Sequence, residues 1–108
     1  MLSGYRIMWL CVMFDLPTET ADDRKAASGF RKNLLNMGFE MAQFSVYIKF
    51  CANSESVATH IKKIEALLPK GGKISVLQFT DKQYERMINY VNGKRAGIKT
   101  APDPFDLY

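Results

Sequence analysis

Asp15 is the residue best placed for chemistry, because it directly follows the apolar run Ile7–Phe14. Pro17 then forces a turn, so the carboxylate is expected where a strand emerges at the end of a sheet. A carboxylate there can hold Mg²⁺, which needs only one or two protein carboxylates beside water and phosphate oxygens. One acid per chain would need a second from a twofold-related copy. The alternative is that the Asp15 side chain caps the turn ahead of the next helix.

Clusters of basic residues offer a second kind of chemistry, the binding of phosphate. In a predicted first helix, the pairs at 24–25 and 31–32 lie about two turns apart, so part of the set can share one side. Such a stripe would track phosphates without reading base sequence, although each pair alone equally suits a solvated helix face. With two lysines at a predicted turn, the candidates for phosphate contact are Arg24, Lys25, Arg31, Lys32, Lys70 and Lys73.

Other catalytic constellations are poorly supported. His60 is the only histidine and falls one step off the apolar stripe of a predicted helix, so a surface position is expected. Cys11 and Cys51 lie in apolar strand-like runs without metal-ligand spacing, and two buried free thiols in a reducing cytoplasm are expected. The segment 70–73 lacks the spacing of a glycine-rich phosphate loop.

Length and composition bound the class of protein. The 108 residues carry a net charge of +4 and are 47% hydrophobic, which fits one globular domain with a mild preference for a nucleic-acid partner. The apolar run at 7–14 is far too short to span a bilayer, and no signal peptide is evident. We therefore expect a cytoplasmic protein with no membrane association.

Hydrophobic periodicity, capping residues and turn-forming residues predict the helices and strands that must position these residues. The run at 6–14 reads as a central strand, and a helix follows from an N-cap at Thr20 to a stop at Gly38. Short strands at 39–42 and 45–51 come next, then a second helix capped by Asn53 or Ser54. A strand at 73–79 leads to a capping box, Thr80 with Gln83, that opens a third helix extending to residue 91.

The order β-α-β-β-α-β predicts an α+β, ferredoxin-like domain, with an antiparallel sheet and both main helices on one face. The apolar side chains on the other face need a cover, and a second subunit is the simplest one. We expect the domain to span residues 1–91, with an extra third helix at its end. Residues 92–108 would form a tail that is irregular up to a short strand at 105–107.

Several segments together carry a resemblance to a known family. They are Phe14-Asp15-Leu16-Pro17, the basic first helix with Arg24-Lys25 and Phe30-Arg31-Lys32, Gly38-Phe39, and Gln43-Phe44-Ser45-Val46-Tyr47. From about residue 6 to residue 91, the chain resembles the small CRISPR-associated endonuclease family (Cas-two). That family is the adaptation partner of the CRISPR integrase in spacer acquisition.

The resemblance implies a ferredoxin-like homodimer in which Asp15 from each subunit shares a Mg²⁺ ion and Ser45 lies near that site. Water activated there would attack a phosphodiester, making the protein an endonuclease on RNA or DNA. It also implies a non-catalytic bridge that holds short double-stranded DNA, the prespacer, between two integrase dimers, and we expect this bridge to be the cellular role. The tail would contact the partner subunit. A more distant alternative is a metal-dependent RNA-interferase, toxin-like and outside CRISPR.

Overall fold

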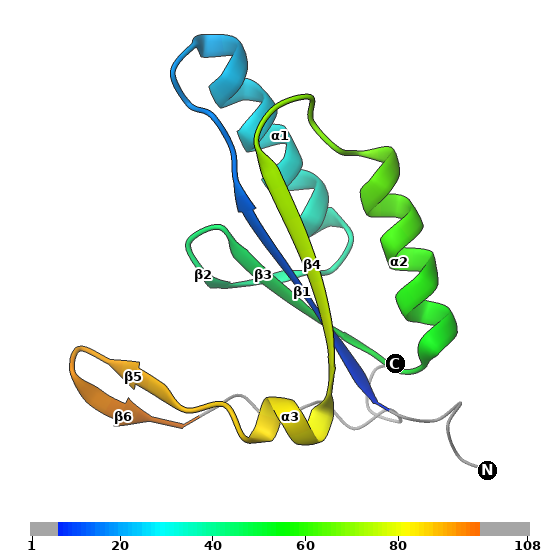
Figure 1. The fold of residues 1–108 in the computed structure, drawn as a ribbon, viewed down its shortest axis with the longest axis vertical. Helices are drawn as coiled ribbons and strands as arrows, with labels where there is room; N and C mark the ends of the chain where they lie inside the picture. The colour runs from blue at the N-terminus through cyan, green and yellow to red at the C-terminus, as the bar shows by residue number, and fades with distance from the viewer. Residues whose placement is uncertain (1–6, 98–108) are drawn as a thin grey trace.

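The computed structural model describes residues 7–97. Its elements are β1 (Met8–Asp15), α1 (Ala21–Asn36), β2 (Glu40–Gln43), β3 (Val46–Cys51), α2 (Ser54–Ala66), β4 (Lys73–Thr80), α3 (Asp81–Glu85), β5 (Asn89–Val91) and β6 (Lys94–Ala96). The first four strands form one sheet in the order β2-β3-β1-β4, with every neighbouring pair antiparallel (Figure 1). This topology confirms the predicted ferredoxin-like α+β fold.

Both long helices pack on one face of the sheet. Side chains alternate along a strand, so Leu10 and Val12 of β1 face the helices and are fully buried. They form one core with Phe30 and Leu34 of α1 and with buried residues of α2. The central position of β1 explains why its run is continuously apolar, since both faces are covered over most of its length.

The helix ends follow the predicted signals. The Thr20 hydroxyl accepts from the backbone N–H of Asp23 (3.0 Å), and the Asp23 carboxylate accepts in return from the N–H of Thr20 (3.3 Å). This capping box fixes where α1 begins. At the other end, Gly38 has a φ of +93°, and Phe39 donates its backbone N–H to the carbonyl of Leu34 (3.0 Å). A residue with a side chain rarely adopts that φ, so glycine ends the helix there.

The third helix was predicted too long. Apolar residues at 84, 87, 88 and 91 fit a helical period, yet α3 ends at Glu85. Residues after it form a hairpin of β5 and β6 around Asn92 and Gly93, with φ angles of 52° and 78°. Two consecutive positive φ values in a two-residue loop define the turn that an Asn-Gly pair favours between strands. The boundary expected after Val91 therefore lies inside this hairpin, and the strand expected at 105–107 lies outside the described residues.

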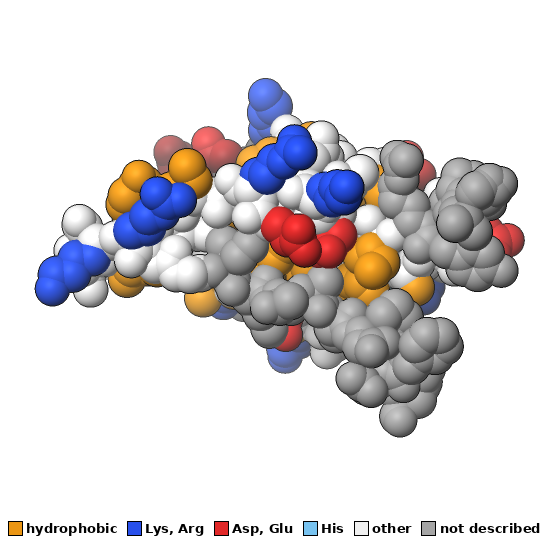
Figure 2. Space-filling view, turned by 90° about the horizontal axis from the view of Figure 1, so that it is seen from below, with side chains coloured by type: hydrophobic (Ala, Val, Ile, Leu, Met, Phe, Trp, Pro, Cys, Tyr) orange, Lys and Arg blue, Asp and Glu red, His pale blue; other side chains and the backbone are white. Residues whose placement is uncertain are grey.

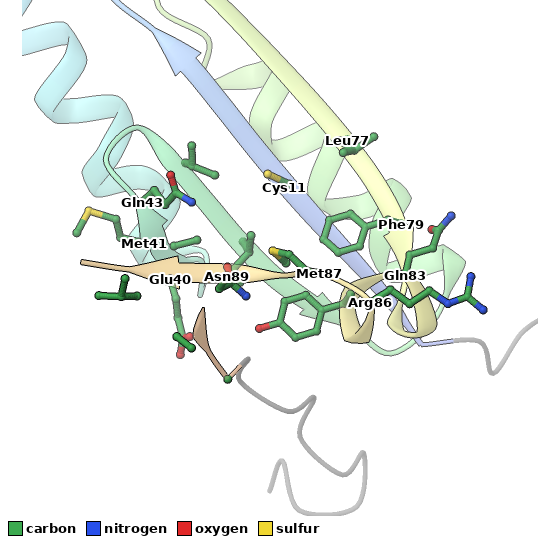
Figure 3. Close-up of a pocket in the computed structure, with 17 residues that line it drawn as sticks. Cys11, Glu40, Met41, Gln43, Leu77, Phe79, Gln83, Arg86, Met87 and Asn89 are labelled. Carbon is green, nitrogen blue, oxygen red and sulfur yellow. The ribbon is translucent and has the colours of Figure 1, made fainter. Parts of the chain in front are cut away.

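The second face of the sheet is only partly covered. At one end, Trp9 of β1 stacks on Tyr84 of α3 (ring centroids 4.1 Å apart) and is 4% exposed. Further along, Met13 and Leu77 are 38% and 51% exposed. A groove of about 670 Å³ lies on this face, and Cys11, Leu77 and Phe79 of the sheet line it together with Met87 and Asn89 (Figure 3). We call this side of the sheet the open face.

The β5–β6 hairpin extends away from the four-stranded sheet (Figure 1). Tyr90 and Val91 are exposed on it, and Lys94 and Arg95 of β6 are exposed as well. Figure 2 shows basic side chains beside hydrophobic ones at this end of the molecule. None of the helices in the described segment 7–97 is long and apolar enough to cross a membrane.

Candidate functional site

Asp15 is the last residue of β1, and its side chain is exposed. The alternation along β1 puts it on the open face, in the series of Trp9, Cys11 and Met13, and it lies opposite Lys73 of β4 in the strand register. The strand therefore runs out of the core and delivers one carboxylate to the sheet end. That placement agrees with the position predicted from sequence.

The turn between β2 and β3 brings Ser45 beside Asp15. The backbone N–H of Phe14 donates to the Ser45 carbonyl oxygen (3.1 Å), so the turn is tied to the strand end one residue before Asp15 (Figure 1). Ser45 is half-buried and has a φ of 62°, a conformation that few residues with side chains adopt. The strained turn thus presents its side chains to the same corner as the carboxylate.

Gly72 supports Asp15 from the other side. It precedes β4 with a φ of +79°, and a Cβ added there would lie 2.5 Å from the Asp15 carbonyl oxygen and 2.8 Å from Cδ2 of Leu16. Only glycine allows both this φ and this close approach of two backbones. The position of Asp15 is therefore set by the β2–β3 turn on one side and by the turn before β4 on the other.

Two hollows meet at this corner. The first has a volume of about 410 Å³, and the residues that line it include Asp15, Ser45, Arg24 and Arg31. The second, of about 330 Å³, is lined by Asp15, Ser45 and Lys73. Three cations and one carboxylate thus line the two hollows, which together we call the Asp15 corner. A surface with this charge balance is suited to phosphate groups.

Arg24 has a structural role as well. One of its guanidinium nitrogens, Nη1, donates to the carbonyl oxygens of Thr18 (3.0 Å) and Glu19 (3.2 Å). These bonds tie the loop between β1 and α1 to the helix. A guanidinium carries five N–H donors, so the group can hold the loop and still offer donors to an anion. Arg31, about two helical turns further along α1, lines the same hollow.

The remaining predicted cations lie elsewhere. Lys25 and Lys32 are exposed on α1 and do not line either hollow, and Lys70 is exposed in the turn before β4. Of the residues predicted for the site, the fold brings together Asp15, Ser45, Arg24, Arg31 and Lys73. It leaves Lys25, Lys32 and Lys70 outside the corner.

A single chain supplies only part of a magnesium site. The Asp15 carboxylate is an exposed oxygen donor of the kind that Mg²⁺ prefers, and Ser45 adds a hydroxyl beside it. Within residues 7–97, no group of three or more acidic, histidine or cysteine side chains could hold a metal ion. The donor set therefore fits Mg²⁺ only when a second carboxylate is brought to the first.

The two cysteines and the histidine do not line either hollow. Cys11 and Cys51 are free and buried, and burial raises the pKa of both thiols, as expected for core cysteines. His60 was expected on the surface but is half-buried. Its Nδ1 lies 2.6 Å from the Ser56 carbonyl oxygen and its ring packs edge-on against Phe39. It helps to join α2 to the core.

Two residues at the corner were not predicted from sequence. Phe44 lines both hollows and is 82% exposed, although the aromatic residues were interpreted mostly as core. The sequence signal for its exposure was its position between two predicted short strands, where a turn is expected. Gly72 was assigned only to a turn, because the contact with Asp15 joins positions far apart in the sequence.

Comparison with known proteins adds an independent line of evidence. The model of the family described as CRISPR associated protein Cas2 matches residues 8–87. A protein from Paracidovorax avenae named CRISPR-associated endoribonuclease Cas2 is 54% identical over the full length of both chains. A protein of the same name from Flavobacterium psychrophilum is 56% identical over 80% of this chain and 75% of its own length.

A third relative of that name, from Streptococcus mutans, is 48% identical over 82% of this chain and 80% of its own length. The matched region spans β1 to the end of α3 and includes the Asp15 corner. It covers most of the chain, and it agrees with the resemblance seen in the segments around Asp15 and Ser45. The chain belongs to the Cas2 family of CRISPR-associated proteins.

Proposed function

We propose that the chain is an endoribonuclease that acts as a homodimer and cleaves phosphodiesters at the Asp15 corner with Mg²⁺. The observation that carries this proposal is the convergence of one exposed carboxylate with Ser45 and three cations. The names of the relatives, CRISPR-associated endoribonuclease, support the choice of RNA as substrate. Because the chain belongs to a CRISPR-associated family, we do not favour the alternative of an RNA-interferase that acts outside CRISPR systems.

The homodimer supplies what one chain lacks. The open face leaves Met13 and Leu77 exposed, and burying apolar surface of this kind favours association. Asp15 projects on the same face as Met13, so a twofold axis through that face can bring two copies of Asp15 together. The pair would then provide two carboxylates for one Mg²⁺ ion, which binds in proteins through one or two carboxylates with water and phosphate oxygens.

In the proposed reaction the chain's own groups bind and orient the substrate. Arg31, Arg24 and Lys73 bind the phosphates on either side of the scissile bond and offset their charge. The two Asp15 carboxylates would hold Mg²⁺, which supplies charge stabilisation at phosphorus and lowers the pKa of water. The Ser45 hydroxyl donates a hydrogen bond to a phosphate oxygen and helps to keep the phosphodiester in line with the attacking water.

The test is cleavage of single-stranded RNA, and of DNA of the same sequence, with and without Mg²⁺. We expect Asp15→Asn to abolish Mg²⁺-dependent RNA cleavage while preserving the fold, because the amide keeps the size of the side chain and removes the charge. Asp22→Asn, an exposed acid in the first turn of α1, is the matched control and should cleave normally. Cleavage that persists in Asp15→Asn refutes the assignment.

A second candidate function uses the cations outside the corner. Lys25 and Lys32 are exposed on α1 and have no part in the two hollows. We propose that they extend the basic surface along the helix, so that the dimer holds a short DNA duplex, the prespacer, between two integrase dimers during spacer acquisition in the cytoplasm. Duplex binding of this kind rests on phosphate contacts and weakens steeply with salt.

Charge reversal separates the two functions. Lys25→Glu with Lys32→Glu should weaken duplex binding and spacer acquisition, while Asp15→Asn should leave both nearly normal. Lys62→Glu with Lys63→Glu, the same change on exposed positions of α2, serves as the control. Unchanged duplex binding in the α1 double variant would count against the bridge.

A further inference from the structure

Phe44 is an aromatic residue whose side chain is exposed to solvent. At 82% it has the highest exposed fraction of the large hydrophobic side chains in the described segment. It sits at the tip of the β2–β3 turn, directly before Ser45 with its positive φ. Single exposed apolar residues are ordinary, so exposure alone implies nothing. Its surroundings are what set this ring apart.

Phe44 lines both hollows of the Asp15 corner, as Phe14, Asp15 and Ser45 also do. On one side the hollow is bounded by Arg24 and Arg31, and on the other by Lys73, while Asp15 lies on both. The hydrogen bond from Phe14 to Ser45 anchors the turn to β1, so the ring is presented from a fixed backbone. A rigid aromatic flanked by cations on two sides is the arrangement with which proteins hold single-stranded nucleic acid.

We propose that Phe44 stacks on the base of an unpaired nucleotide, while the phosphates on either side of that nucleotide lie in the two hollows. The inference rests on the proposed ribonuclease function and names a residue that would position its single-stranded RNA substrate. In a duplex both faces of each base are covered by neighbouring bases, so the ring can reach a base only where the strand is unpaired.

The size of the corner agrees with this occupant. The hollows of about 410 and 330 Å³ both fall within the range of roughly 300–1,000 Å³ that is typical of sites for small ligands. Each is therefore large enough for a sugar-phosphate unit, and the ring that lines both is left for the base. Stacking tolerates any base, so the site selects the unpaired state of the strand and not its sequence.

The experiment measures binding apart from cleavage. In the Asp15→Asn background, a single-stranded RNA carries a fluorescent adenine analogue whose emission is quenched by stacking, and the same strand is also tested in a duplex. We expect quenching with the single strand only. Phe44→Leu should remove the quenching and weaken single-strand binding by roughly 5- to 150-fold, while leaving duplex binding unchanged. Phe44→Tyr should restore both, because it keeps the aromatic face.

Tyr90→Leu is the matched control, since it removes a 66% exposed ring on the hairpin and should change nothing. Unchanged quenching and affinity in Phe44→Leu overturn the inference and leave the ribonuclease proposal standing if Asp15→Asn is inactive. A change of oligomeric state in Phe44→Leu also overturns it, because the second copy would then cover the ring. Wild-type protein that binds no RNA at all defeats both proposals.

Discussion

Replacing Gly72 by alanine tests whether the turn before β4 sets the position of Asp15. The substitution has two costs. The φ of +79° is unfavourable for any residue with a Cβ, by roughly 1–2 kcal/mol. The new Cβ would also lie 2.5 Å from the Asp15 carbonyl oxygen and 3.0 Å from Cα of Leu16. These are backbone atoms that no side-chain rotation can move aside, and overpacking of this kind costs typically about 1–3 kcal/mol more.

Gly93 provides the control for the conformational term. It has nearly the same φ, +78°, and a Cβ there would meet nothing within 4 Å. Gly93→Ala should therefore lower the free energy of unfolding by roughly 1–2 kcal/mol, and Gly72→Ala by about 2–5 kcal/mol. The difference between the two variants isolates the contact with Asp15 from the strain of the positive φ.

The assay is urea unfolding, followed by the fluorescence of Trp9, which is the only tryptophan and is buried against Tyr84. RNA cleavage is measured under conditions where both variants remain folded. We expect Gly72→Ala to lose activity, because relief of the clash must move the strand end that carries Asp15, and Gly93→Ala to keep it. Equal losses of stability in the two variants would refute the reasoning.

Three further predictions concern stability. Gly29 lies inside α1 with nothing within 4 Å of an added Cβ, so Gly29→Ala should raise the urea midpoint by an amount that corresponds to about 0.5–1 kcal/mol, and a lowered midpoint would show a contact there. Because burial raises the pKa of the Cys11 and Cys51 thiols, the folded chain keeps protons that the unfolded chain releases above about pH 9. Stability should thus fall as the pH rises through that range, and a variant with alanine at both positions should show a smaller fall. The Trp9 Nε1–H donates to the Asp81 carboxylate (2.9 Å), so Asp81→Ala should cost about 0.5–3 kcal/mol and red-shift the tryptophan emission; unchanged emission would contradict the bond.

Local signals in the sequence predicted most of the fold. Capping residues act over three or four positions, so Thr20 and Thr80 located the starts of α1 and α3 correctly. For α2 the sequence offered Asn53 or Ser54, and the structure has Asn53 as the N-cap. The apolar run before Asp15 identified β1 as the central strand. The exception was the segment after Tyr84, where apolar spacing suited a helix and the Asn-Gly pair at 92–93 suited a hairpin. The hairpin prevailed because that pair readily takes two positive φ angles, which a helix cannot contain.

The faces of β3 show a different kind of limit. Val46, Ile48 and Phe50 alternate with Tyr47 and Lys49, so the sequence predicts one apolar face and one mixed face. In the fold, Tyr47 and Cys51 are buried in the core, and the more apolar set lies on the open face. The choice depends on the pairing of β3 with β1, since a shift of one residue would exchange the faces.

The sequence by itself determined that Asp15 stands at the end of a central strand, because hydrophobic periodicity and the turn at Pro17 are properties of neighbouring residues. It also determined the Cas2 family. Only the tertiary structure decided which of the predicted cations share a corner with Asp15, and that Phe44 and Gly72 belong there. Such contacts join β1, α1, the β2–β3 turn and the start of β4. Their geometry follows from strand order and register, which no local pattern of residues records.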